Sequence, residues 1–153
     1  PSFQQDILVR KKDLYDGAIP SGNAVMAWNL HRLSILLNAP HYKNRAETMV
    51  ELQKDNIIRY PTSFGIWANL LLELVNGTSE VLVLGPGATK AGFNFLKKYV
   101  PNKVMMASEK VEAGFPLMEN KKHIDVLMYF LCKRYSCQLP VLSEEELMNQ
   151  IGY

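Results

Sequence analysis

The hydrophobic pattern of the chain changes at Glu80, and this change limits the possible folds more than any other feature. Before Glu80, apolar residues recur at the three- and four-residue spacing of helices. After it, an apolar run, a glycine-rich turn, a helical stretch and a second run follow, as in a βαβ unit with two parallel strands. We therefore expect a helical segment at residues 1–78 and a small α/β unit at residues 79–153, packed together in one compact fragment.

The helical segment is expected to contain three helices, at residues 21–37, 42–59 and 64–75, whose short connections make them antiparallel neighbours. The first helix has apolar residues on two opposite sides, which predicts an interior position. One stripe is formed by Met26, Leu30, Leu33 and Leu37, and the other by Ala24, Trp28 and Ile35. The second helix is amphipathic with a charged outer face, and the third is largely apolar and therefore buried.

The α/β unit is expected to be a three-stranded, mostly parallel sheet of the α+β kind, with a C-terminal helix. Its strands are predicted at residues 81–84, 103–107 and 126–132. The last of these is the longest apolar run and the best candidate for a central strand buried on both faces. Ser143 is followed by three glutamates, which is typical of the first turn of a capped helix.

Charge and composition exclude several classes of protein. The net charge is +2 over 153 residues, and the basic and acidic residues are intermixed, so we expect neither nucleic acid nor a membrane surface as a partner. No apolar run approaches the roughly 20 residues of a membrane span, and no signal peptide opens the chain. With only two cysteines, a cytoplasmic location is expected. The start at Pro1, without Met, suggests a piece of a longer protein.

Cys132 and Cys137 are five residues apart. On one extended strand they would lie about 16 Å apart on opposite faces, whereas a disulfide needs Cα atoms within about 7 Å. Only a reversal through residues 133–136 could join them, and that segment contains neither Gly nor Pro. We therefore expect two free, buried or half-buried thiols. A redox role for the pair is the alternative, and it requires the two sulfurs to be adjacent with at least one of them exposed.

Other residues with chemical potential each have an ordinary interpretation. Gly85-Pro86-Gly87 lacks the further glycine of a dinucleotide site and the Gly-Lys-Ser/Thr of a P-loop, so a tight turn is favoured over a phosphate site. The histidines His31, His41 and His123 have no metal-ligand spacing, and we expect neither a metal nor another cofactor. Asp16 either acts as an acid, a base or a ligand for hydroxyls, or stabilises its turn through nearby backbone N–H groups. Trp28 either stacks on a sugar or belongs to the core.

Several motifs together resemble one known family. The turn Asp-Gly-Ala-Ile-Pro-Ser-Gly-Asn at residues 16–23 continues into Trp-Asn-Leu at 28–30 and Arg-Leu at 32–33. Further motifs agree in order along the chain: Pro-Thr-Ser-Phe at 61–64, Pro-Asn-Lys-Val at 101–104 and Cys-x4-Cys-Gln-Leu-Pro-Val at 132–141. Over nearly its whole length the chain resembles the C-terminal segment of the spermatogenesis-associated protein 20 family. These proteins join a thioredoxin-like domain to a helical toroid of the six-hairpin glycosidase type.

The resemblance implies where a site would lie. The turn at residues 16–23 would sit near the open face of the toroid, where sugars bind in that architecture. The resemblance makes Asp16, which is also the catalytic candidate, and Ser21 and Asn23 candidates for facing a sugar or another hydroxyl-rich molecule. Trp28 is a further binding candidate because its ring could stack on a sugar. We expect a ligand-binding or structural segment that is not catalytic alone. The alternatives are sugar epimerisation, isomerisation or hydrolysis in the intact toroid, and thiol redox chemistry at Cys132 and Cys137.

A segment cut from a toroid would expose apolar helix faces. We therefore expect contacts with the missing N-terminal part of the parent chain, or association into a homo-oligomer.

Overall fold

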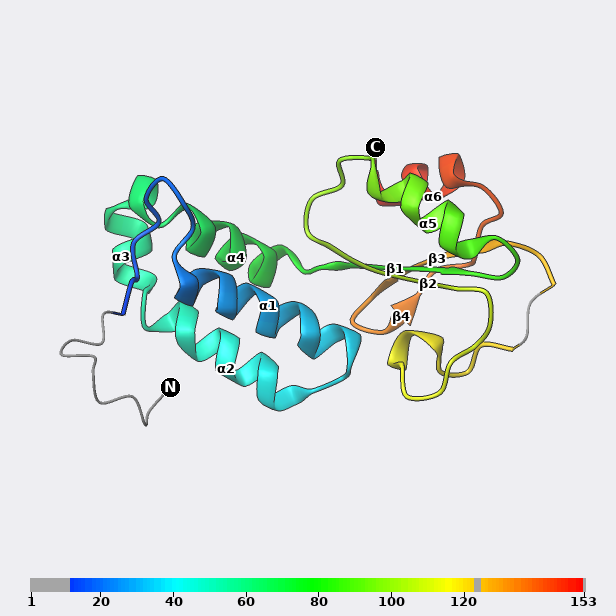
Figure 1. The fold of residues 1–153 in the computed structure, drawn as a ribbon, viewed down its shortest axis with the longest axis horizontal. Helices are drawn as coiled ribbons and strands as arrows, with labels where there is room; N and C mark the ends of the chain where they lie inside the picture. Colours follow the sequence, from blue (N-terminus) through cyan, green and yellow to red (C-terminus); the bar gives the residue numbers. More distant parts are fainter. Residues whose placement is uncertain (1–11, 123–124, 153) are drawn as a thin grey trace, which may run out of the picture.

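The computed structural model describes residues 12–122 and 125–152. A helical layer occupies one end of the elongated molecule and a mixed α/β unit the other (Figure 1). The chain passes from one to the other at residues 77–78, between the end of α4 and the start of β1. Within the described residues, no helix is long and apolar enough to cross a membrane.

The helical layer contains four α-helices and a short 3-10 turn, one helix more than predicted. They are α1 (Gly22–Leu36), α2 (Pro40–Glu51), α3 (Lys54–Arg59), η1 (Pro61–Ser63) and α4 (Gly65–Asn76). The helix predicted at residues 42–59 is two helices, because the chain turns at Leu52 and Gln53. Neither Gly nor Pro marks this break, which explains why the sequence pattern did not show it.

The interior position predicted for the first helix is wrong for one of its two stripes. Met26 is 53% exposed and Leu33 40% exposed, so the larger apolar stripe of α1 faces outward. The buried face instead carries small or polar side chains, namely Ala24, Ala27, His31 and Ser34. Small side chains let α1 approach its neighbours closely. The core beneath it is completed by Val50, Ile57, Phe64, Trp67 and Leu70.

The sheet has four strands in the order β2-β1-β3-β4. The strands are β1 (Ser79–Leu84), β2 (Lys103–Ser108), β3 (Met128–Lys133) and β4 (Ser136–Cys137). The predicted βαβ unit is present, since β1 and β2 are parallel with Ser79 opposite Lys103. However, β3 is antiparallel to β1, and β4 is antiparallel to β3. A mostly parallel, three-stranded sheet was therefore the wrong prediction, because the chain adds a hairpin at the edge.

Each face of the sheet is covered by a different kind of structure (Figure 1). Helices α5 (Ala88–Leu96) and α6 (Glu144–Ile151) cover the face that carries Val81 and Val83. The connection that contains η2 (Pro116–Met118) covers the opposite face, which carries Leu82 and Leu84. The predicted start of the last helix is confirmed, since Ser143 and Glu146 form a reciprocal capping box.

Candidate functional site

Asp16 joins the starts of two helices. One carboxylate oxygen accepts a hydrogen bond from the backbone N–H of Ser21 at 2.9 Å, and the other accepts from the N–H of Ile66 at 2.8 Å. A carboxylate at the N-termini of α1 and α4 also has a favourable interaction with the helix dipoles. Both oxygens therefore bind backbone groups, which is the turn-stabilising arrangement. A catalytic role for Asp16 stays a prediction.

Ser21 and Asn23 also contribute to the start of α1. The Ser21 hydroxyl accepts a hydrogen bond from the N–H of Ala24 at 3.3 Å, as an N-cap residue does. The Asn23 side-chain amide donates to the carbonyl of Asp13 at 2.7 Å. Ligand binding by these two residues stays a prediction.

Trp28 lies further along α1 and lines a pocket of about 740 Å³ between the helical layer and the α/β unit. We call it the Trp28 pocket. Helices α1 and α4 form one wall, and the end of α5 with the connection into β2 forms the other. Its aromatic and polar lining residues are Trp28, Arg32, Asn69, Asn76, Tyr99, Asn102 and Lys103.

A buried carboxylate orients two of these lining residues. Glu73 is fully buried, and its Oε2 accepts a hydrogen bond from the indole N–H of Trp28 at 2.7 Å. The Arg32 guanidinium lies 3.8 Å from the same oxygen and 4.7 Å from the centre of the Trp28 ring. Trp28 and Arg32 are thus held as a stacked pair, with a flat aromatic surface beside a positive charge.

Lys103 adds a second positive charge to the Trp28 pocket. Its ammonium donates to the carbonyl of Val100 at 3.1 Å. Burial lowers the pKa of Lys103, and the positive charge of Arg32 lowers it further. The lining residues of this pocket in the described part of the chain include no Asp or Glu. The pocket therefore suits an anion better than a cation.

A second pocket, of about 530 Å³, lies beside His31 and the tip of the β3–β4 hairpin. The Nε2 of His31 is 3.0 Å from the hydroxyl of Thr78, which donates to Oε1 of Glu73 at 3.1 Å. Burial lowers the pKa of His31, and the nearby Glu73 carboxylate opposes that effect. Burial in the folded chain therefore favours the neutral ring.

The described residues contain no cluster of His, Cys, Asp and Glu side chains that could hold a metal ion. His123 lies outside the described residues.

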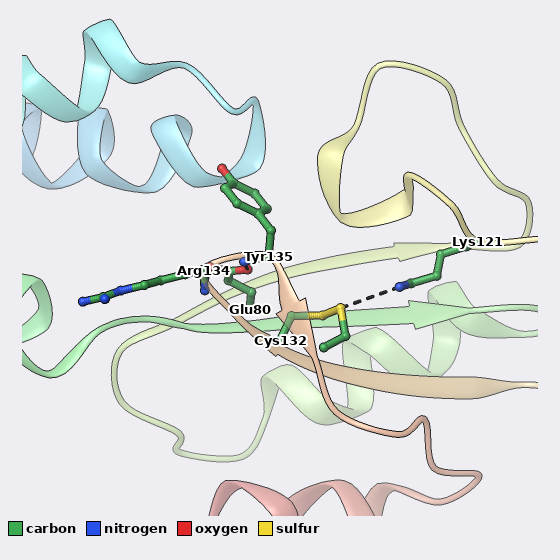
Figure 2. The surroundings of a disulfide bond; sticks show 6 residues. Glu80, Lys121, Cys132, Arg134 and Tyr135 are labelled. Carbon is green, nitrogen blue, oxygen red and sulfur yellow. Dashed lines mark hydrogen bonds between the residues drawn. A yellow bond between two sulfur atoms is a disulfide. The ribbon is translucent and has the colours of Figure 1, made fainter.

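Cys132 and Cys137 form a disulfide, so the prediction of two free thiols is wrong (Figure 2). The chain reverses between them, which places their Cα atoms 3.8 Å apart as opposite residues of β3 and β4. Arg134 and Tyr135 both adopt positive φ in the turn, a conformation normally taken by Gly or Asn. Glu80 of β1 accepts hydrogen bonds from both of their backbone N–H groups. These two hydrogen bonds help to stabilise a turn conformation that Gly would adopt more readily.

The surroundings of the two sulfur atoms differ. Cys132 is 1% exposed, whereas Cys137 is only partly buried on the edge strand β4. The Lys121 ammonium lies 3.6 Å from the Cys137 sulfur, and Figure 2 shows it approaching from the side of the η2 connection. The adjacent sulfurs meet one requirement of the redox alternative. Because disulfides are rare in the reducing cytoplasm, the bond also weakens the argument for a cytoplasmic location. That location stays a prediction.

Curated proteins match the chain over more than nine-tenths of its length. The rat (Rattus norvegicus) protein is 26% identical over 152 residues, and the human (Homo sapiens) protein is 24% identical over 149 residues. This chain is a distant homologue of spermatogenesis-associated protein 20. The predicted resemblance is therefore confirmed. The match covers 93% of this chain but only 19% of the rat spermatogenesis-associated protein 20, so this chain spans about a fifth of that relative's length.

No protein-family model matches the chain, and no solved structure matches it. The thioredoxin-like domain and the helical toroid of the spermatogenesis-associated protein 20 family therefore stay predictions for this protein.

Proposed function

We propose that this chain is the ligand-binding part of a larger protein related to spermatogenesis-associated protein 20. The proposed ligand is a small, anionic, hydroxyl-bearing molecule, such as a sugar phosphate or a sugar acid, bound in the Trp28 pocket. The observation that carries the proposal is the stacked pair of Trp28 and Arg32, which the buried Glu73 carboxylate holds in place.

The charge of the pocket supports an anionic ligand. Arg32 and Lys103 come from the two opposite walls, and the positive charge of Arg32 acts on Lys103. A phosphate or carboxylate between them would reduce their repulsion. A guanidinium also presents paired N–H donors that suit these anions. The Arg32 Nε is buried and has no hydrogen-bond partner within the described residues, so it is one donor that a ligand would satisfy.

The remaining lining residues support hydroxyl groups on the ligand. Asn69, Asn76 and Asn102 carry amides that both donate and accept hydrogen bonds, as sugar hydroxyls do. The aromatic faces of Trp28 and Tyr99 suit the apolar C–H faces of a sugar ring. An apolar pocket wall with a few polar groups is the usual composition of a small-molecule site.

Binding is favoured over catalysis for this chain alone. Glycoside hydrolysis ordinarily uses two carboxylates that flank the scissile bond. The described lining residues of the Trp28 pocket supply none, because Glu73 lies buried beneath it and its oxygens are bonded to Trp28 and Thr78. A sugar-processing reaction would need its acid and base from the rest of the larger protein.

The proposal can be tested by thermal unfolding with glucose, gluconate, glucose 6-phosphate and inorganic phosphate. A ligand at ten times its Kd adds about 1.4 kcal/mol of stability, which raises Tm by roughly 3–6 °C in a domain of this size. We expect gluconate or glucose 6-phosphate to raise Tm by this amount, and glucose and phosphate to raise it less. Arg32→Gln should abolish the effect, whereas Arg45→Gln, on an exposed part of α2, should retain it. If no anion raises Tm, the proposal is wrong.

A further inference from the structure

The tip of the β3–β4 hairpin fastens the sheet to the helical layer. The Tyr135 hydroxyl donates to the carbonyls of Ser34 and Ile35 near the end of α1, at 3.3 Å and 2.9 Å. The Lys133 ammonium donates to the carbonyl of Asn76 at the end of α4, at 2.6 Å. Figure 2 shows the Tyr135 side chain reaching from the turn towards the helices. Side chains of two residues of the hairpin, Lys133 and Tyr135, therefore hold the ends of two helices.

The disulfide lies at the base of this turn, and its two sulfurs differ in access. Cys132 packs in an apolar cluster with Leu82, Leu117 and Phe130 and is almost fully buried. Cys137 lines a small surface cavity of about 140 Å³ together with Lys121. A reagent from solvent can therefore approach the Cys137 sulfur, but it cannot reach Cys132 without opening the core.

The charge near the disulfide also favours reaction at Cys137. The active form of a thiol in exchange reactions is the negatively charged thiolate. The Lys121 ammonium, 3.6 Å from the Cys137 sulfur, attracts an incoming thiolate to that sulfur, and in the later step it stabilises the Cys137 thiolate as the leaving group. The same ammonium lies 5.0 Å from the centre of the Phe130 ring, a contact that helps to keep it in place.

We propose that Cys137 is a thiol–disulfide exchange site for a dithiol reductant. A thiolate of the reductant forms a bond to the Cys137 sulfur while the Cys132–Cys137 bond breaks. The electron pair of that bond leaves on the Cys132 sulfur, which takes up a proton from solvent. The second thiol of the reductant then gives its proton to solvent and bonds to the reductant's first sulfur, and the bond from that sulfur to Cys137 breaks, so that Cys137 leaves as a thiolate beside Lys121. The protein disulfide gains two electrons, and the dithiol is oxidised to a disulfide.

Opening the disulfide weakens the attachment of the two layers. Arg134 and Tyr135 hold positive φ, which is unfavourable for residues with a side chain. The turn is restrained by the disulfide below it and by the Glu80 carboxylate beside it. After reduction the Glu80 carboxylate is the remaining one of these two restraints on the turn. The hydrogen bonds from Tyr135 to α1 therefore break more often. The redox state of Cys137 thereby sets how firmly the hairpin holds α1.

The exchange site can be mapped with glutathione, a monothiol whose mixed disulfide with the protein is trapped by lowering the pH. The oxidised chain is incubated with glutathione, quenched in acid and cleaved with trypsin, which separates the two cysteines by cutting after Lys133 and Arg134. We expect about tenfold more glutathione on Cys137 than on Cys132, because accessibility controls which sulfur is attacked. Equal labelling, more label on Cys132, or no labelling until urea unfolds the chain would overturn the proposal.

Two variants test the role of Lys121. Lys121→Gln should slow the labelling of Cys137 several-fold, whereas Lys122→Gln, at the exposed neighbouring residue, should leave the rate unchanged. Equal rates in the two variants would overturn the electrostatic role of Lys121.

Hydrogen exchange tests the effect on α1. Reduction with dithiothreitol should speed amide exchange near residues 36–39, and Tyr135→Phe should have the same effect in the oxidised chain. Unchanged exchange on reduction would overturn the link between the disulfide and α1.

Discussion

The Glu80 carboxylate accepts hydrogen bonds from the backbone N–H groups of both Arg134, at 2.8 Å, and Tyr135, at 2.9 Å. Glu80 lies on β1, opposite Cys132 in the register of β1 and β3. One buried side chain therefore satisfies both donors of a turn that is more than 50 residues away in the sequence. It explains how a tight hairpin forms without Gly and how the two cysteines meet.

Replacing Glu80 should destabilise the hairpin. Glu80→Gln leaves one oxygen to accept a hydrogen bond, and its amide N–H₂ faces the second donor. An unpaired N–H costs about 1–3 kcal/mol when fully buried. Because these two hydrogen bonds are partly buried, we expect a loss near the lower end of that range in urea unfolding of the oxidised chain. Glu112→Gln, at an exposed residue, should have little effect. Arg134→Gly in the Glu80→Gln background should recover part of the loss, because Gly adopts positive φ readily. Equal stability of Glu80→Gln and the wild type would contradict this account of the turn.

Replacing Asp16 should separate its two predicted roles. In the turn-stabilising role, Asp16→Asn loses one of the bonds to Ser21 and Ile66, and stability should fall by about 1–2 kcal/mol without any ligand. The measurement is urea unfolding beside Glu109→Gln, an exposed control. Catalytic residues are often held at some cost to stability. A gain in stability for Asp16→Asn would therefore count against the turn-stabilising role and for the catalytic one.

His31 should make the stability of the chain depend on pH. Burial lowers its pKa in the folded state below the unfolded value of 6.5, so the proton binds more tightly to the unfolded chain. This contribution to stability is complete above pH 6.5 and is lost as pH falls from there towards the folded pKa. We expect urea midpoints to fall between pH 7 and pH 5, and the fall to be smaller in His31→Gln. The control is His41→Gln, at an exposed histidine. Identical pH slopes in the wild type and His31→Gln would contradict this prediction.

The elements with local signals were the ones that could be predicted from the sequence. The parallel pair of β1 and β2 is indicated by two apolar runs with a helical stretch between them. The capping box of α6 is indicated by Ser143 and the glutamates that follow it. The hairpin could not be predicted in this way. Its turn depends on Glu80, which no pattern within residues 132–137 could indicate.

The same distinction applies to the candidate site. Trp28 was identified from its residue type and from the motif around it. Arg32 and Lys103 were not, because they lie about 70 residues apart in sequence and meet only when the helical layer packs beside β2. Glu73 is the one charged residue on the largely apolar helix α4. The signal that could have found it was the cost of burying an unpaired carboxylate, which implies nearby donors such as Trp28 and Arg32.

The most direct test of the proposed function is calorimetric titration of the oxidised chain with glucose 6-phosphate and with glucose. The account predicts that glucose 6-phosphate binds at least tenfold more tightly, since a charge-assisted contact contributes about 1.5–3 kcal/mol. It also predicts that Arg32→Gln loses this preference while Arg45→Gln keeps it. Equal binding of the two sugars, or binding of the phosphate that Arg32→Gln leaves unchanged, would contradict an anion site in the Trp28 pocket.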